Sequence, residues 1–276
     1  MIFARDKSQM CNNLLQYAHV YAWGREHGRK VISMRFSYKF RYFRICHTPL
    51  TGLGWYLLAK YAAAIGLLPT ASFKHSDCDY KALERKMLRH RHIVVSGWNV
   101  RFYDLFLKYR KEICDLFQID AQFTEPVTAK MQETERKVGE RGIRLGVHVR
   151  RGDYAQWKNG KYFYDDETYA RHINRFAGFH PNKTINVYLS TNDPSVSAER
   201  FQQLCPKVSV HHLQGSAPED LFMLSACDYL IGPPSTFSLV AAMYRDLPLF
   251  RIDTPDSSKM TPEGFRLFDD WFRRIV

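Results

Sequence analysis

The chain has 276 residues, of which 45% are hydrophobic and 25% are charged, so it can form one large packed domain or two ordinary ones. Its six cysteines are scattered and none forms a CxxC pair with another, which argues against a zinc site. The first residues show no secretory signal, so we expect a cytoplasmic protein with free thiols.

The net charge of +12 is unevenly distributed along the chain. Residues 1–140 contain 23 Lys and Arg against 13 Asp and Glu, whereas residues 141–276 contain 17 against 15. The basic excess can meet anionic lipid or an anionic acceptor, or it can serve only to keep the surface soluble. No helix-turn-helix, zinc finger or RNP-type motif is present, so we expect no nucleic-acid partner.

The chain opens with a β-α-β pattern, which predicts a parallel sheet. The elements are a short strand over residues 1–4, a helix over 10–26 and a strand over 31–36. The polar stretch RDKSQMCNN joins the first strand to the helix and can direct backbone N–H groups and Asn12 at a ligand. Plain capping of the helix by Ser8 explains the same stretch equally well.

A basic segment over residues 25–44 is followed by an apolar, aromatic-rich segment over 50–68. The apolar segment is too short and too interrupted to span a bilayer, which needs about 20 apolar residues. Two interpretations stay open: peripheral contact with an anionic membrane such as the inner membrane, and ordinary packing against protein. A second basic cluster, residues 81–92, has the spacing of a solvated helix face.

A short strand over residues 93–97 and a helix over 103–117 complete the first half. The polar segment 124–142, a helix followed by a turn, is the expected domain boundary. We therefore divide the chain into a domain of residues 1–140 and a domain of residues 141–276.

The second half alternates regularly between strands and helices, which predicts a doubly wound parallel sheet. All strands then end at one edge of the sheet, and the polar clusters HVRRGDY, STNDP, HLQGS and GPPSTFS all fall there. Their convergence predicts a pocket for a nucleotide. The expected strands are 143–149, 185–190, 208–211, 228–232 and 248–252, and the expected helices are 166–177, 195–204, 218–226, 236–245 and 263–275.

The stretch IRLGVHVRRGDY carries the most informative side chains. Apolar residues recur at every second position of a strand, which places His148 and Arg150 on the other face and Arg151 at the strand end. Two adjacent guanidinium groups suit a diphosphate, and Asp153 follows the turn at Gly152. A surface strand end with solvated charges is the alternative.

A helix is expected to begin within the stretch GPPSTFS, with Ser235 or Thr236 as its cap. The backbone N–H groups of the first turn of this helix attract an anion. An ordinary capped helix with no ligand gives the same pattern. Asp220 opens the preceding helix, either as a partner of the helix dipole or as a carboxylate that reads a base. Asp193 is expected to form an Asx-turn, and Asp228 to have a structural role.

The blocks HVRRGDY, YLSTNDP and EDLFMLSACDYLIGPPSTFS resemble the three donor-site blocks of the α-1,2- and α-1,6-fucosyltransferase superfamily. The opening SQMCNNLLQYAHVYAWGREHG is similar to the bacterial α-1,2-fucosyltransferase-like group. The resemblance implies two Rossmann-like domains of the GT-B type, with the donor site in the second domain and the acceptor side in the first. It also implies GDP-fucose as donor, inversion at the anomeric carbon and no metal or other cofactor. In such a fold the C-terminal helix can cross back to the first domain.

The resemblance also assigns roles to single residues. Arg150 and Arg151 match the catalytic pair that binds the diphosphate, and Asp153 is expected to hold an arginine in place. The remaining matches are His148 for the nucleoside, Asp220 for the base, Ser235 and Thr236 for the phosphates and Asn12 for the sugar. No general base is identified; His19, Asp153 and the carboxylates of the first half are all candidates.

From this resemblance we expect an inverting, metal-independent transfer of fucose from GDP-fucose to a hydroxyl of a glycan acceptor, free or lipid-linked, in surface polysaccharide synthesis. A transferase that uses another nucleotide sugar is one alternative. A non-catalytic nucleotide-binding protein at a membrane surface is another.

Overall fold

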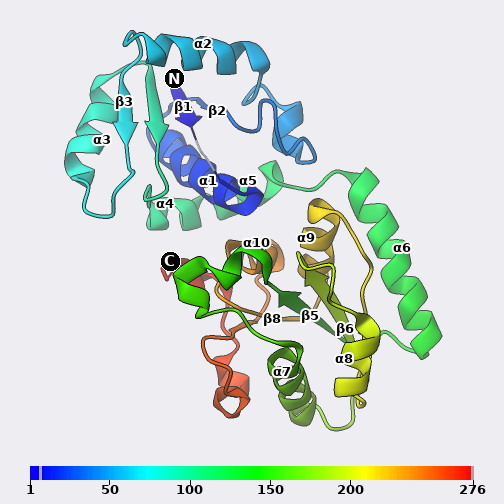
Figure 1. Ribbon diagram of the computed structural model, residues 1–276. Helices are drawn as coiled ribbons and strands as arrows, with labels where there is room; N and C mark the ends of the chain where they lie inside the picture. The colour runs from blue at the N-terminus through cyan, green and yellow to red at the C-terminus, as the bar shows by residue number, and fades with distance from the viewer. Residues whose placement is uncertain (6–7, 275–276) are drawn as a thin grey trace. The chain divides into compact units, whose positions relative to one another are not determined.

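The computed structural model describes residues 1–5 and 8–274, and it forms two compact units, Met1–Asp120 and Ala121–Val276. Each unit is built on a parallel sheet with helices packed on it (Figure 1). The predicted α/β class with two parallel sheets is therefore confirmed. Residues 6 and 7 of the polar stretch RDKSQMCNN lie outside the described residues.

The first unit has a four-stranded sheet in the order β2-β1-β4-β3, in which all neighbouring strands are parallel. The β-α-β opening is present as predicted, with a helix that has the expected bounds. The predicted strand 31–36 is shorter, and a strand at residues 70–72 was not predicted. The strands are β1 (Ile2–Arg5), β2 (Val31–Ser33), β3 (Thr70–Ser72) and β4 (Ile93–Ser96), and the main helices are α1 (Met10–Glu26) and α2 (Leu53–Ala64).

Helices α1 and α2 cover opposite faces of this sheet (Figure 1). On one face, α1 approaches so closely that a Cβ at Gly24 would lie 2.3 Å from a methyl group of Val31. On the other face, Ala59 of α2 packs in a cluster with Phe3 and Ile32. The sheet is thus buried on both sides, as its continuous apolar strands require.

The rest of the first unit consists of short helices. The predicted helix 103–117 is interrupted at Tyr109, so that it forms two helices. The predicted basic helix face around residues 81–92 corresponds to a helix over 80–89. The bounds are η1 (Arg44–His47), α3 (Tyr80–Arg89), α4 (Tyr103–Lys108) and α5 (Arg110–Leu116).

Helix α6 (Ala121–Val138) belongs to the second unit, so the units divide between Asp120 and Ala121 and not at residue 140. A buried ion pair ties the helix to the second sheet: Arg144 Nη2 donates to Glu135 Oε2 at 2.9 Å. The hydroxyl of Tyr188 donates to the same carboxylate at 3.2 Å. The predicted boundary was too late because the polar composition of α6 resembles a linker, although its inner side makes these buried contacts.

The second unit has a five-stranded parallel sheet in the order β7-β6-β5-β8-β9, which confirms the predicted strands. The strand order reverses between β5 and β8, and such a reversal is where open α/β sheets bind ligands. The strands are β5 (Ile143–Val149), β6 (Ile185–Thr191), β7 (Ser209–His211), β8 (Tyr229–Gly232) and β9 (Leu249–Arg251). The helices are α7 (Asp166–Phe179), α8 (Ala198–Leu204), α9 (Ala217–Ser225) and α10 (Thr236–Arg245).

The predicted terminal helix 263–275 is wrong in extent, and its last residue lies outside the described residues. A single turn is followed by an extended stretch, in which Arg266 bridges to Leu249, and then by a five-residue helix. Trp271 anchors this helix by donating its indole N–H to the carbonyl of Leu249 at 2.9 Å. The passage of this segment back to the first unit stays a prediction. The short helices are η2 (Gly152–Ala155), η3 (Trp157–Gly160), η4 (Ser257–Lys259), η5 (Pro262–Gly264) and α11 (Phe268–Phe272).

Candidate active site

The loops that follow β5 and β8 are neighbours at the point where the strand order reverses. Val147 pairs with Ile231 in the parallel ladder, and a Cβ at Gly232 would lie 3.1 Å from the Cβ of His148. Beyond the strands, the hydroxyl of Tyr154 donates to the carbonyl of Pro234. The structure therefore brings the loop of Arg150 and Arg151 together with the loop of Ser235 and Thr236.

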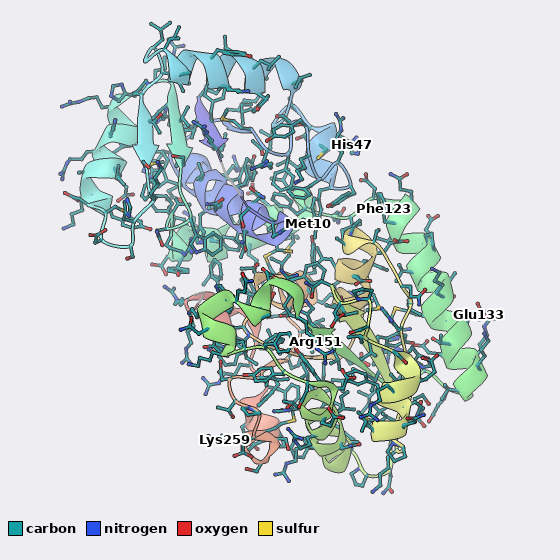
Figure 2. All side chains as sticks on the ribbon, in the orientation of Figure 1. Met10, His47, Phe123, Glu133, Arg151 and Lys259 are labelled. Carbon is teal, nitrogen blue, oxygen red and sulfur yellow. The ribbon has the colours of Figure 1, made fainter. Side chains whose placement is uncertain are left out.

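Arg151 lies in the second unit (Figure 2). Its side chain is buried, and most of its hydrogen-bonding capacity is used by the protein itself. Its Nε donates to the carbonyl of Tyr164 at 3.0 Å, one Nη donates to Asp166, and the other Nη lies 3.4 Å from Asp193. Burial lowers the pKa of the Arg151 guanidinium, but these two carboxylates outweigh it and hold that pKa above its ordinary value. The two arginines that were predicted to bind the diphosphate together thus have different surroundings, and Arg151 anchors the loop.

The backbone of this loop is fixed from the neighbouring strand and helix. The amide of Arg151 donates to Asn192 Oδ1 at 3.0 Å, and the amide of Arg150 donates to the hydroxyl of Tyr169 at 3.2 Å. Gly152 has φ +47°, and a Cβ there would lie 2.4 Å from the side chain of Asn192. The turn therefore requires glycine both for its backbone conformation and for space.

Arg150 has a different environment from its neighbour. One Nη lies 2.6 Å from Asp153 Oδ1, and the guanidinium carbon lies 5.5 Å from the centre of the Tyr154 ring. The Asp153 side chain is 62% exposed, whereas that of Arg150 is 21% exposed. The prediction that Asp153 holds an arginine is confirmed for Arg150. Because this carboxylate is exposed, a more highly charged anion can take its place at little cost.

His148 is buried at the end of β5, with its ring 5.1 Å from the ring of Phe237. Burial lowers the pKa of His148 to about 3, so the imidazole is neutral at physiological pH. Its Nδ1 has no hydrogen-bond partner within residues 1–5 and 8–274. A buried polar atom without a partner is rare in a native fold, and it marks a position that a ligand can satisfy.

Asp220 lies one strand away from His148, in the first turn of α9. His148 pairs with Ser190 of β6, and the Ser190 hydroxyl donates to Asp220 Oδ2 at 2.9 Å. Burial raises the pKa of this carboxyl to about 7. Gly215 covers the other oxygen so closely that a Cβ there would lie 2.9 Å from Asp220 Oδ1.

The helix start predicted in GPPSTFS is present, since α10 begins at Thr236 with Ser235 as its N-cap. The Ser235 hydroxyl accepts a hydrogen bond from the amide of Phe237 at 3.2 Å. The positive end of the α10 dipole therefore lies at the carboxyl end of β8, next to the loop that carries Arg150.

Two predicted site residues belong to the first unit. Asn12 lies on α1, where its Nδ2 donates to the Ser8 hydroxyl at 2.9 Å, and the helix N-cap is Gln9, not Ser8. His19 is fully buried, accepts the amide of Phe102 at Nδ1 and has a pKa lowered by burial to about 3. His19 is therefore a core residue, and the suggestion that it serves as general base is wrong.

Two aspartates have the structural roles that were predicted. The amide of Ser195 donates to Asp193 Oδ1 at 2.9 Å, which is the expected Asx-turn. The amide of Arg144 donates to Asp228 Oδ2 at 2.9 Å.

In the described part of the chain, no group of three or more His, Cys, Asp or Glu side chains is placed to hold a metal ion.

Several residues that shape the site were not predicted. Tyr154 lies in HVRRGDY and Phe237 lies in GPPSTFS, but the contacts that their rings make cannot be read from the spacing of residues in the sequence. Ser190 and Asn192 belong to the polar cluster at the carboxyl end of β6, and only the position of that cluster at the sheet edge pointed to them. Asp166 was visible only as the start of a helix.

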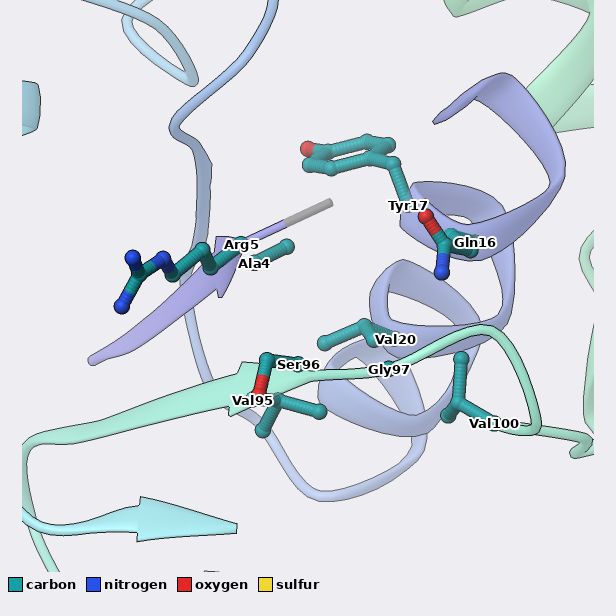
Figure 3. Close-up of a pocket in the computed structure, with 9 residues that line it drawn as sticks. All are labelled: Ala4, Arg5, Gln16, Tyr17, Val20, Val95, Ser96, Gly97 and Val100. Carbon is teal, nitrogen blue, oxygen red and sulfur yellow. The ribbon is translucent and has the colours of Figure 1, made fainter. Parts of the chain in front are cut away.

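The first unit has a small depression at the carboxyl ends of β1 and β4, where its own strand order reverses (Figure 3). It lies between these strands and α1, and Arg5, Gln16, Tyr17 and Ser96 are among its lining residues. Its space of about 10 Å³ admits about one water molecule. Both sheets therefore have polar side chains at the corresponding edge.

Comparison with protein families gives a match over most of the chain. Residues 74–258 match the model described as glycosyl transferase family 11. No curated protein matches the sequence.

Solved fucosyltransferase structures share the fold at low sequence identity. An R-to-K mutant of Arabidopsis thaliana FUT1 in complex with GDP has a TM-score of 0.62 and 13% identity, covering 96% of this chain and 73% of that one. POFUT1 in complex with GDP has a TM-score of 0.56 and 12% identity, with coverages of 89% and 94%. The Bradyrhizobium α-1,6-fucosyltransferase NodZ, soaked with GDP-fucose, has a TM-score of 0.52 and 14% identity, with coverages of 91% and 94%.

Proposed function

Because the chain belongs to glycosyl transferase family 11, we propose that it transfers fucose from GDP-fucose to a hydroxyl of a glycan acceptor. The observation that carries the proposal is the placement of Arg150, His148 and the α10 N-terminus around one sheet edge, where the strand order reverses. The fold shared with fucosyltransferases solved with GDP or GDP-fucose supports this donor.

In this proposal the diphosphate lies between the Arg150 guanidinium and the first turn of α10. Asp153 gives up its ion pair with Arg150 when the more highly charged diphosphate enters. As the bond from fucose to the diphosphate breaks, negative charge grows on the departing oxygen. Arg150 and the helix terminus stabilise that charge more in the transition state than in the ground state.

Positive charge from these two sources lets the reaction proceed without a metal ion. The acceptor hydroxyl attacks the anomeric carbon from the face opposite the diphosphate, so the configuration there inverts. Arg151 acts as a positioning residue, because its bonds to Tyr164, Asp166 and Asp193 hold the loop that presents Arg150.

The nucleoside occupies the side of the site that includes His148 and Asp220. The ionised Asp220 carboxylate accepts hydrogen bonds from N–H groups of the guanine ring. These hydrogen bonds favour the charged form of Asp220 over the neutral form that burial alone favours. The buried His148 imidazole contacts the nucleoside through the nitrogen that lacks a protein partner. We further propose that the first unit, with Asn12 facing the sugar, forms the acceptor side.

We propose a cytoplasmic location, which is supported by the finding that none of the six cysteines in the described residues forms a disulfide. We also propose a role in surface polysaccharide synthesis. A free or lipid-linked glycan is the expected acceptor.

Thermal-shift measurements with GDP, UDP and CMP test the donor. Only a ligand that binds the folded chain raises its melting temperature by mass action, so GDP alone should do so. A shift with UDP or CMP instead of GDP would show that another nucleotide sugar is the donor. A GDP shift without transfer from GDP-fucose to mixed glycan acceptors would show a non-catalytic nucleotide-binding protein.

A further inference from the structure

Helix α2 presents an apolar face to solvent. Large apolar residues recur at every fourth position along this face: Leu53, Leu57, Tyr61 and Ile65, with 40–71% of each residue exposed. An ordinary surface helix instead buries its apolar face and exposes polar side chains. Of the eleven large hydrophobic side chains exposed in the described residues, eight fall between residues 38 and 67. We define these eight as the α2 patch: Tyr38, Leu53, Trp55, Leu57, Leu58, Tyr61, Ile65 and Leu67.

The opposite side of α2 already provides its attachment to the protein. Tyr56, Ala59 and Ala63 pack on the cluster formed by the first sheet, and Ala59 is the only buried residue of the helix. Trp55 of the patch also reaches this cluster, with its ring 6.3 Å from the ring of Phe3, whereas Leu57, Leu58 and Tyr61 are not part of it. No helix of the described residues is long and apolar enough to cross a bilayer.

The stretch of sequence that carries the α2 patch is basic. Residues 27–76 contain no Asp or Glu, although 25% of the whole chain is charged. Within the part of the chain that the structure describes, no carboxylate lies within ion-pair distance of Lys39, Arg41 or Lys60. The eight cations of this segment are Arg29, Lys30, Arg35, Lys39, Arg41, Arg44, Lys60 and Lys74.

The basic loop before η1 contacts α2 at Tyr56. Arg35 donates to the Tyr38 hydroxyl at 2.8 Å, and the Tyr38 ring lies 4.7 Å from the Tyr56 ring of α2. On the helix itself, the Lys60 ammonium lies 5.6 Å from the centre of the Tyr61 ring. Apolar, aromatic and cationic groups thus form one continuous surface.

We propose that the α2 patch lies on an anionic phospholipid surface, with α2 parallel to the membrane plane. The leucine, isoleucine and tryptophan side chains enter the boundary between headgroups and acyl chains, and the surrounding Lys and Arg bind lipid phosphates. A second copy of the chain fits this surface poorly, because a symmetric contact would set like charges against each other. The inference does not depend on the proposed donor or acceptor.

Vesicle co-sedimentation of the full chain tests the proposal. We expect binding to phosphatidylcholine vesicles that contain about 30% phosphatidylglycerol, and at least about tenfold weaker binding to pure phosphatidylcholine. Salt of about 0.5 M should weaken the binding severalfold, because the Debye length then falls to a few ångströms.

Two matched double variants separate the α2 patch from general surface hydrophobicity. Leu57→Glu with Leu58→Glu should reduce vesicle binding at least about tenfold, since it places two anions at the lipid contact. The control is Leu88→Glu with Leu267→Glu, which makes the same chemical change at sites of similar exposure: 57% and 44%, against 40% and 57% for Leu57 and Leu58. Equal binding by both variants would overturn the proposal.

Two further measurements keep the outcome clear. The tryptophan fluorescence of the unmodified chain should shift to the blue on anionic vesicles, and Trp55→Phe should remove most of that shift. A shift that Trp55→Phe leaves unchanged would contradict the proposal.

Light scattering during gel filtration reports self-association. A dimer that Leu57→Glu with Leu58→Glu dissociates, without vesicle binding by either form, would show that the patch joins two copies and overturn the lipid assignment.

Discussion

The two units use their charges in opposite ways. The first unit, residues 1–120, holds 20 Lys and Arg against 9 Asp and Glu, and many of these cations are exposed. The second unit, residues 121–276, holds 20 against 19, and its central cations are paired and partly or fully buried. Paired charge fixes local structure, whereas exposed unpaired charge is available to a partner. Arg150 and Arg151 show a related difference within a single loop: Arg150 pairs with one exposed carboxylate, whereas Arg151 pairs with two carboxylates that are largely buried.

The largest effect is expected at Arg150. Replacing it by Ala should lower kcat about 10²–10³-fold, because the leaving diphosphate loses a preorganised positive charge. The melting temperature should change little, since the ion pair that is lost joins Arg150 to the exposed Asp153. Steady-state kinetics with GDP-fucose and a thermal scan check both parts, and normal turnover would refute the role.

Arg151→Ala should instead act first on stability. It leaves Asp166 and Asp193 without their common cation, which should cost about 2–4 kcal/mol in the free energy of unfolding. Urea unfolding of this variant beside Arg150→Ala gives the comparison. Equal stability of the two variants would mean that the arginines do not differ as their contacts indicate.

Asp220→Asn should separate stability from nucleotide binding. The folded pKa of Asp220, raised to about 7, lies above the ordinary value, so the folded state binds more protons between those two pH values and loses stability as pH rises. Removing the charge should therefore stabilise the apoprotein at pH 8 by up to about 4 kcal/mol and have little effect at pH 4. GDP binding should weaken in the variant, because the amide loses the charged acceptor. Thermal scans at both pH values and GDP titration check these expectations, and unchanged GDP affinity would remove Asp220 from the base site.

The smallest effect is expected for a surface pair of the first unit. Arg25 and Glu112 lie 2.7 Å apart with side chains 49% and 41% exposed, so Glu112→Gln should cost less than about 1 kcal/mol. Urea unfolding measures the change. If Glu112→Gln lowered the free energy of unfolding as much as Arg151→Ala does, the proposed difference between exposed and buried ion pairs would be contradicted.

Much of the second unit could be predicted because its elements alternate regularly. The helix start at Ser235 and the strand 143–149 agree with the prediction, since capping residues and β periodicity are local signals. In the first unit, a helix over 10–26 was equally clear, but a three-residue strand at 70–72 is too short to show periodicity.

The surroundings of the site depended on distant contacts. Asp166 and Asp193 lie 15 and 42 residues from Arg151, so the sequence could not show that one arginine is anchored and the other is accessible. His19 stood in a helix among polar and apolar residues, and only the packing of that helix shows that its ring is enclosed. Local patterns identify which residues gather at an edge, but not which of them are already engaged.

The buried pair of Glu135 and Arg144 has a practical consequence for studying the halves separately. A C-terminal fragment that begins at residue 141 would expose the sheet surface beneath α6 and would leave Arg144 without its carboxylate partner. A fragment that begins at Ala121 would retain both residues of the pair, and we expect it to be the better choice for nucleotide titrations.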